Sequence, residues 1–195
     1  MKRIMIAATA VLAVATTALA FSDEGGRGFR EFLNGFKEAP NPIATSATGT
    51  FKATISEDAT EINYELTFEN LEGDVRQAHI HIGHPQTAGG IVLWLCQTAT
   101  NMNPIAGNST PLCTADDPTN LRSGRVTGTL TMADVVPQVN ELPNGIAGPA
   151  EWEQVLALVR AGRTYANVHS SKFGPGEIRS QIDNRDDGDH GGGHH

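Results

Sequence analysis

Residues 51–68 read FKATISEDATEINYELTF, and apolar and polar side chains alternate on both sides of a short polar turn. Every second residue from Phe51 to Ile55 is apolar, and so is every second residue from Ile62 to Phe68. A period of two is typical of a β-strand that buries one face. This stretch therefore predicts two strands joined by a turn at residues 56–60.

The same signal recurs on both sides of this stretch. Further strands are predicted at residues 75–83, 90–96, 124–131, 164–169 and 177–182. One helix is predicted between Pro149 and Gly162, because Trp152, Val155, Leu156 and Val159 follow helical spacing. A helical turn is expected at 132–136, before Pro137. The fold class predicted is all-β: an antiparallel sandwich or open barrel of about seven strands with one or two short helices.

Composition excludes several classes of protein. A length of 195 residues suits one domain. The chain has 14 basic and 22 acidic side chains, which gives a net charge of -8. Basic residues form no cluster, so nucleic acid is not an expected partner. With 39% hydrophobic and 18% charged residues, the chain is too apolar for disorder and too poor in charge for a coiled coil.

The two ends of the chain differ from its middle. Residues 1–20 have two basic residues, an apolar run and a small-x-small ending, which predicts a secretory signal peptide and no transmembrane segment after its cleavage. Residues 21–46 are interpreted as a lead-in, partly within the domain, that docks through its aromatic side chains. Residues 183–195 are rich in Asp, Gly and His and are expected to be disordered; weak metal binding is a second property of such tracts.

The cysteines indicate the compartment. Cys96 and Cys113 are the only two, and an even pair in an exported chain favours a disulfide over a thiolate metal site. The predicted location is therefore the periplasm or the extracellular space.

Histidines are the main candidates for chemistry. His79 and His81 alternate with Ile80 and Ile82, so both imidazoles fall on one face of a strand and could chelate one ion. A polar strand face that makes ordinary hydrogen bonds is the structural alternative. Hydrolase, phosphate-loop, dinucleotide and metalloprotease motifs do not occur in the sequence.

The late strands offer further candidates. His169 shares a strand face with Asn167 and becomes a third ligand if that strand lies near His81. Glu177 could then orient an imidazole as a second-layer partner, together with Asn167 and Arg179. The competing interpretation is a structural network of Glu177 and Arg179 with a neighbouring strand.

Several motifs, in order, resemble the CHRD domain, a repeat found in chordin and in exported bacterial proteins. They begin with Leu33-Asn34-Gly35-Phe36-Lys37-Glu38-Ala39-Pro40 and continue through Thr48-Gly49-Thr50 and Ala78-His79-Ile80-His81-Ile82-Gly83. They end with Gly162-Arg163-Thr164-Tyr165-Ala166-Asn167-Val168-His169 and Gly176-Glu177-Ile178-Arg179-Ser180-Gln181-Ile182, where Ser180 replaces the usual Gly. The resemblance covers residues 29–182, and residues 97–121 look like an insertion.

The resemblance implies an extracellular setting and a protein-binding or structural role. The expected function is therefore that of a non-enzymatic module with a protein or cell-envelope partner. The His-x-His strand also resembles copper/zinc superoxide dismutase, whose two-metal site needs six His and an Asp. Only four His precede the tail, so a single-ion version would have to recruit His84. The alternative function is accordingly copper or zinc binding, with dismutase-like redox activity as its extension.

Overall fold

The fold is built almost entirely of antiparallel strands. A computed structural model describes residues 27–114, 116–137 and 146–183, and all eight of its strands belong to one sheet. The strands are β1 (Gly28–Asn34), β2 (Thr48–Ile55), β3 (Glu61–Glu69), β4 (Val75–Ile82), β5 (Ile91–Cys96), β6 (Gly124–Thr131), β7 (Thr164–Ser170) and β8 (Ile178–Ile182). The all-β class predicted from the sequence is confirmed.

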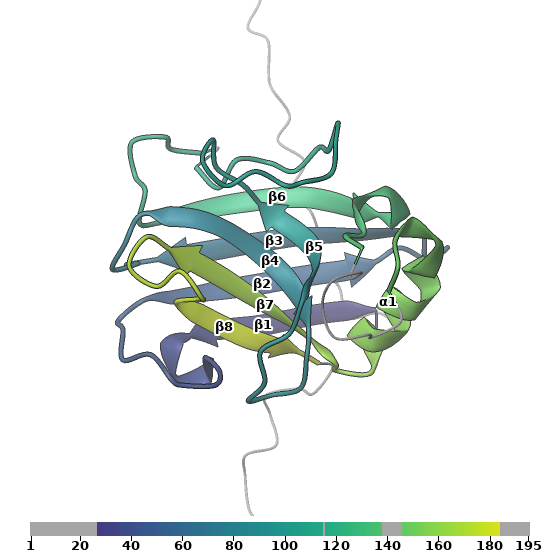
Figure 1. The fold of residues 1–195 in the computed structure, drawn as a ribbon, viewed down its shortest axis with the longest axis horizontal. Helices are drawn as coiled ribbons and strands as arrows, with labels where there is room; N and C mark the ends of the chain where they lie inside the picture. The colour runs from purple at the N-terminus through teal and green to yellow at the C-terminus, as the bar shows by residue number, and fades with distance from the viewer. Residues whose placement is uncertain (1–26, 115, 138–145, 184–195) are drawn as a thin grey trace, which may run out of the picture.

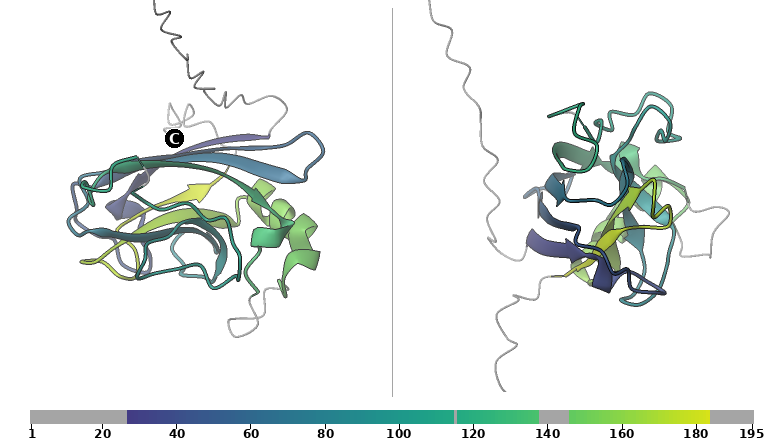
Figure 2. Two further views of the ribbon diagram at one scale, coloured as in Figure 1. Left: turned by 90° about the horizontal axis from the view of Figure 1, so that it is seen from above. Right: turned by 90° about the vertical axis from the view of Figure 1, so that its left-hand side faces the viewer.

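The sheet curls into a nearly closed barrel. Its strand order is β5-β4-β7-β8-β1-β2-β3-β6, so β4 and β7 are neighbours although 82 to 95 residues separate their paired positions. Figure 1 shows the strands running side by side, and Figure 2 shows the two halves of the sheet facing each other. Apolar side chains of both halves meet in one core, which is what strands with one buried face require.

The predicted helix closes one end of the barrel. A 3-10 turn at Pro149–Glu151 leads into α1 (Trp152–Arg160), which buries the four side chains named from its helical spacing. The Trp152 indole donates a hydrogen bond to the carbonyl of Ala59. Figures 1 and 2 show α1 at the end of the barrel, and a further 3-10 turn at Met132–Asp134 confirms the turn expected there.

The lead-in contains a strand that the sequence pattern did not indicate. β1 pairs along its whole length with β2 and at Asn34 with β8. Docking through the aromatic side chains is only partly right: Phe29 is buried, whereas Phe32 and Phe36 are 48% and 73% exposed. Backbone pairing, together with burial of Phe29 and Leu33, attaches this segment to the domain.

The seam between the edge strands β5 and β6 is filled by other groups. The Tyr64 hydroxyl donates to the Leu95 carbonyl, and the Val136 amide donates to the Val92 carbonyl. A disulfide joins Cys96, at the end of β5, to Cys113. It closes a loop of 17 residues, which by loop entropy contributes about 3 kcal/mol, and it fits an oxidising compartment.

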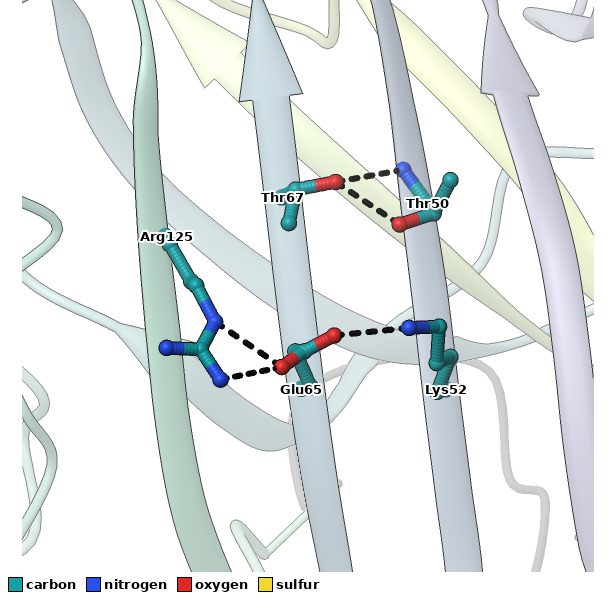
Figure 3. Close-up of polar contacts among 5 residues, drawn as sticks. All are labelled: Thr50, Lys52, Glu65, Thr67 and Arg125. Atoms are coloured by element: carbon teal, nitrogen blue, oxygen red, sulfur yellow. Dashed lines mark hydrogen bonds and ion pairs between the residues drawn. The ribbon is translucent and has the colours of Figure 1, made fainter. Parts of the chain in front are cut away.

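The outer face of β2, β3 and β6 is covered by polar pairs. Glu65 accepts hydrogen bonds from Lys52 on one side and Arg125 on the other, while the Thr50 and Thr67 hydroxyls bond to each other (Figure 3). Lys52 and Arg125 lower the pKa of Glu65 mainly through these hydrogen bonds. These charged side chains pair with one another and link the three strands.

The predicted ends of the chain lie largely outside the described residues. The signal peptide at 1–20 and the tail from residue 184 onward belong to segments that the structure does not describe. Within the described residues, the helices are all too short and too polar to cross a membrane.

Candidate metal centre

Three histidines from two paired strands form one buried cluster. β4 supplies His79 and His81, and β7 supplies His169. The antiparallel register places His79 opposite Asn167 and His81 opposite Tyr165, so His169 follows on the same face. The structure thus brings together the three residues that the sequence singled out.

The imidazoles are close enough to share one ion. One ligand nitrogen from each lies within 4.8 Å of the other two, and His79 Nδ1 is 3.2 Å from His169 Nε2. Zn–N bonds of about 2.0–2.1 Å place ligand nitrogens roughly 3.3–4.1 Å apart, so small side-chain shifts would complete the site. The side chains are 0%, 7% and 5% exposed for His79, His81 and His169, respectively.

Backbone carbonyls fix the tautomers of two of the rings. His81 Nδ1 lies 2.9 Å from the Gly89 carbonyl, and His169 Nδ1 lies 2.8 Å from the Gly174 carbonyl. A carbonyl only accepts, so each Nδ1 carries the proton and each Nε2 keeps a lone pair. His81 Nε2 is thereby prepared as a metal ligand, in the way that outer partners orient metal-bound histidines. His169 Nε2 accepts a hydrogen bond from His79 Nδ1 in this structure, a bond that a bound ion would replace.

Burial keeps the cluster uncharged. Desolvation, with neighbouring imidazoles second, lowers the pKa of His79 well below its usual value. It likewise lowers the pKa of His81 to about 3 and lowers that of His169. At neutral pH all three rings are therefore in the neutral form that binds metal.

Aromatic rings form the walls of the cluster. The Trp94 ring lies edge-on to His79 with 4.2 Å between ring centroids, and the Tyr165 ring stacks on His81 at 4.8 Å. The Cζ atom of Arg179 lies 3.4 Å from the centroid of the Tyr165 ring. Arg179 is itself buried. Rings on these sides exclude water and hold the imidazoles in place.

A loop at residues 83–90, which we call the cover loop, is fastened over this face. Arg179 donates to the carbonyls of His84 and Thr87, and Gln181 donates to the carbonyl of Gly83. The Tyr165 hydroxyl accepts from the Gly89 amide. The loop that orients His81 is therefore positioned by side chains of β7 and β8.

Two expectations about this region need correction. His84 does not join the cluster: its side chain is exposed, and it contributes a backbone carbonyl to Arg179. Glu177 does not orient an imidazole: its Oε1 accepts from the Thr45 hydroxyl and the Glu72 amide, and its Oε2 has no hydrogen bond within the described residues. Glu177 instead ties loops together. The rings of His81 and His169 are already oriented by loop carbonyls.

A buried polar group lies next to the cluster. Asn167 faces Gly176, where a Cβ would come within 2.6 Å of both Asn167 amide atoms and 2.8 Å of Glu38 Oε1. Gly176 also has φ +142, so glycine is required here. Burial raises the pKa of Glu38 to about 7, although Arg179 and Asn167 oppose the shift.

This shift predicts a pH-dependent gain for Glu38→Gln. A carboxyl whose folded pKa is raised from 4.5 to about 7 stabilises the fold below pH 4.5 and loses that contribution as the pH rises to 7. The free energy of unfolding of the variant should therefore gain on the wild type by up to about 3 kcal/mol between pH 4.5 and 8. Urea unfolding of both proteins across this range checks it, and a difference that does not change with pH would contradict it.

Sequence reasoning missed the groups that complete the site. Gly89 and Gly174 act through backbone carbonyls, which leave no mark in the sequence. Trp94 lies within an apolar run that indicated only a buried strand, and Glu38 was quoted only as part of a family motif. Their roles depend on loop positions that the pattern of residues does not contain.

Comparison with known proteins gives one finding. Residues 29–182 match the family model of the CHRD domain, which covers every described strand except the first residue of β1. No curated protein and no solved structure matches the chain. Because the match spans most of the sequence and includes the strands that carry the three histidines, the chain belongs to the CHRD domain family.

Proposed function

We propose that this CHRD domain is a non-enzymatic binding module whose histidine cluster holds one copper or zinc ion. One observation carries the proposal: three neutral, buried imidazoles converge so that their ligand nitrogens lie within 4.8 Å of one another. Copper and zinc are the ions that imidazole suits, whereas calcium and magnesium prefer oxygen ligands.

The nitrogens of the cluster argue against a purely structural role. In the described part of the protein, His79 Nε2 and His81 Nε2 are buried and have no hydrogen-bond partner. Leaving a buried polar atom unpaired costs about 1–3 kcal/mol. An ion that accepts the lone pair of His81 Nε2 would remove that cost. A network that only held strands together would be expected to pair these nitrogens with protein groups.

Export completes the proposal. The signal-like residues 1–20 and the disulfide support a location in the periplasm or outside the cell, where a protein or cell-envelope component would be the partner. Dismutase-like turnover is the second candidate, since the same imidazoles could carry copper. Burial of all three rings beneath the cover loop favours holding an ion over turning over a substrate at it.

Metal titration tests the proposal. We expect stoichiometric binding of copper or zinc to the wild type, with affinity lowered more than about a hundredfold in His79→Ala/His81→Ala, because loss of an outer partner alone costs about 10- to 100-fold. Calorimetric titration measures this. The tail histidines His190, His194 and His195 are replaced by Asn in every sample, so that they cannot bind the ion.

His84→Ala is the matched control. Its side chain is exposed and outside the cluster, so its affinity should equal that of the wild type. Equal metal binding by the wild type and the double variant, with both folded by circular dichroism, would overturn the proposal. Copper-loaded protein should also be assayed for superoxide turnover, since activity lost in His81→Ala would promote the second candidate.

A further inference from the structure

The charge around the cluster bears on which ion it holds. Among the described residues, the group that could hold an ion consists of three histidines and includes no carboxylate or thiolate. The three rings are neutral at pH 7, so the ligands bring no negative charge to the ion. We infer that this centre selects monovalent copper, Cu(I), over divalent ions, an inference that rests on the proposed function.

Burial makes the ion's charge decisive. The three side chains are at most 7% exposed, and Tyr165 and Trp94 rings pack against two of them. The cost of moving an ion from water into such surroundings rises with the square of its charge, so a dication costs roughly four times as much as a monocation before its ligands compensate. Anionic ligands normally provide that compensation, and this cluster has only neutral ones.

Arg179 adds a positive charge on the same side. Its guanidinium stacks on Tyr165, which in turn stacks on His81. The Arg179 guanidinium is thus separated from the His81 imidazole by a single ring. A fixed cation at this position repels a dication twice as strongly as a monocation.

The number of ligands points the same way. Zinc in structural protein sites almost always has four ligands, and the protein supplies all four of them. The cluster supplies three, and Glu38 and Glu177 are not part of it. Three imidazole nitrogens satisfy Cu(I), a soft ion that accepts low coordination numbers, whereas zinc would need a fourth ligand that the cluster itself does not supply.

The test compares three ions on one protein. The full chain, with the tail histidines replaced by Asn, is titrated without oxygen with Cu(I) against bicinchoninate, and separately with Cu(II) and Zn(II) against chromophoric chelators. We expect the Kd for Cu(I) to be at least about a thousandfold below that for Zn(II), and also below that for Cu(II).

The Asn167→Asp variant is expected to weaken the preference for Cu(I). Asn167 pairs with His79 across β4 and β7, so its side chain lies on the face of the cluster. A carboxylate there attracts a dication more strongly, and the preference for Cu(I) over Zn(II) should narrow at least tenfold. Asn120→Asp makes the same charge change at an exposed turn and should leave the preference unchanged.

The outcomes separate the two proposals. Tighter binding of Zn(II) or Cu(II) than of Cu(I), lost in His79→Ala/His81→Ala, would overturn the selectivity and leave the metal centre standing. No binding of any ion beyond that of the double variant would overturn the proposed function itself. If Asn167→Asp does not fold, the ratio of affinities in the wild type decides alone.

Discussion

Lowering the pH from 7 to 5 should destabilise the metal-free Glu38→Gln variant by about 4 kcal/mol or more. His79 and His81 keep a pKa far below the ordinary value of 6.5 in the fold, so they stay neutral at pH 5 while the unfolded chain binds a proton on each. Each such ring costs about 2 kcal/mol over this interval, and His169 adds to the loss. Typical net stabilities are only 5–15 kcal/mol.

The direction follows from which state binds more protons. A histidine with a lowered folded pKa contributes stability above pH 6.5, and that stability is lost as the pH falls. Glu38 acts in the opposite direction, because its raised pKa lets the folded state take up a proton between pH 7 and 4.5. The Gln variant removes this offset of about 2 kcal/mol. Glu65, whose pKa is lowered, weakens the fold only at more acidic pH.

Urea unfolding at pH 7, 6 and 5, with a chelator present, measures the effect. Adding His79→Gln and His81→Gln to the Glu38→Gln background removes two titrating rings, and the free energy of unfolding should then vary much less with pH. A loss of less than 1 kcal/mol in the parent variant, or the same loss in both proteins, would show that the rings are protonated in the fold.

The strands were predictable wherever burial followed a simple alternation. β2 and β3 place apolar residues at every second position, and the pattern was confirmed. β1 was not predicted, because Glu31 occupies one of its buried positions and Phe32 one of its exposed positions. The backbone amide of Asp183 donates to the Glu31 carboxylate, which makes that burial acceptable. Such a partner, about 150 residues away, leaves no local pattern.

The site was predictable only in part, for a related reason. The His-x-His spacing places two rings on one face of β4 within a few residues, so local geometry is sufficient. The third ligand depends on pairing of β4 with β7, a contact between distant segments that the sequence could state only as a condition. The tautomers depend on carbonyls of Gly89 and Gly174, whose positions are set by loops.

Replacing Arg179 with Met should cost about 3–5 kcal/mol of stability and loosen the cover loop. The side chain is 2% exposed and donates to the carbonyls of His84 and Thr87, which methionine would leave unpaired. Its charge also opposes the raised pKa of Glu38, so its removal leaves that buried carboxyl uncompensated. Breaking a buried charge network by removing one partner typically costs this much.

Arg125→Met is the matched control for this prediction. Arg125 donates its hydrogen bonds to a carboxylate instead of to backbone carbonyls, its side chain is 54% exposed, and exposed ion pairs contribute at most about 1 kcal/mol. Urea unfolding compares the two variants, and amide hydrogen exchange at Gly89 reports on the loop locally, because that amide donates to Tyr165. Faster exchange at Gly89 in Arg179→Met alone would show that the guanidinium holds the cover loop over the histidines. If both variants lost the same small amount of stability and Gly89 stayed protected, the loop would instead be held by Tyr165 and Gln181, and the charge of Arg179 would be its only effect on the centre.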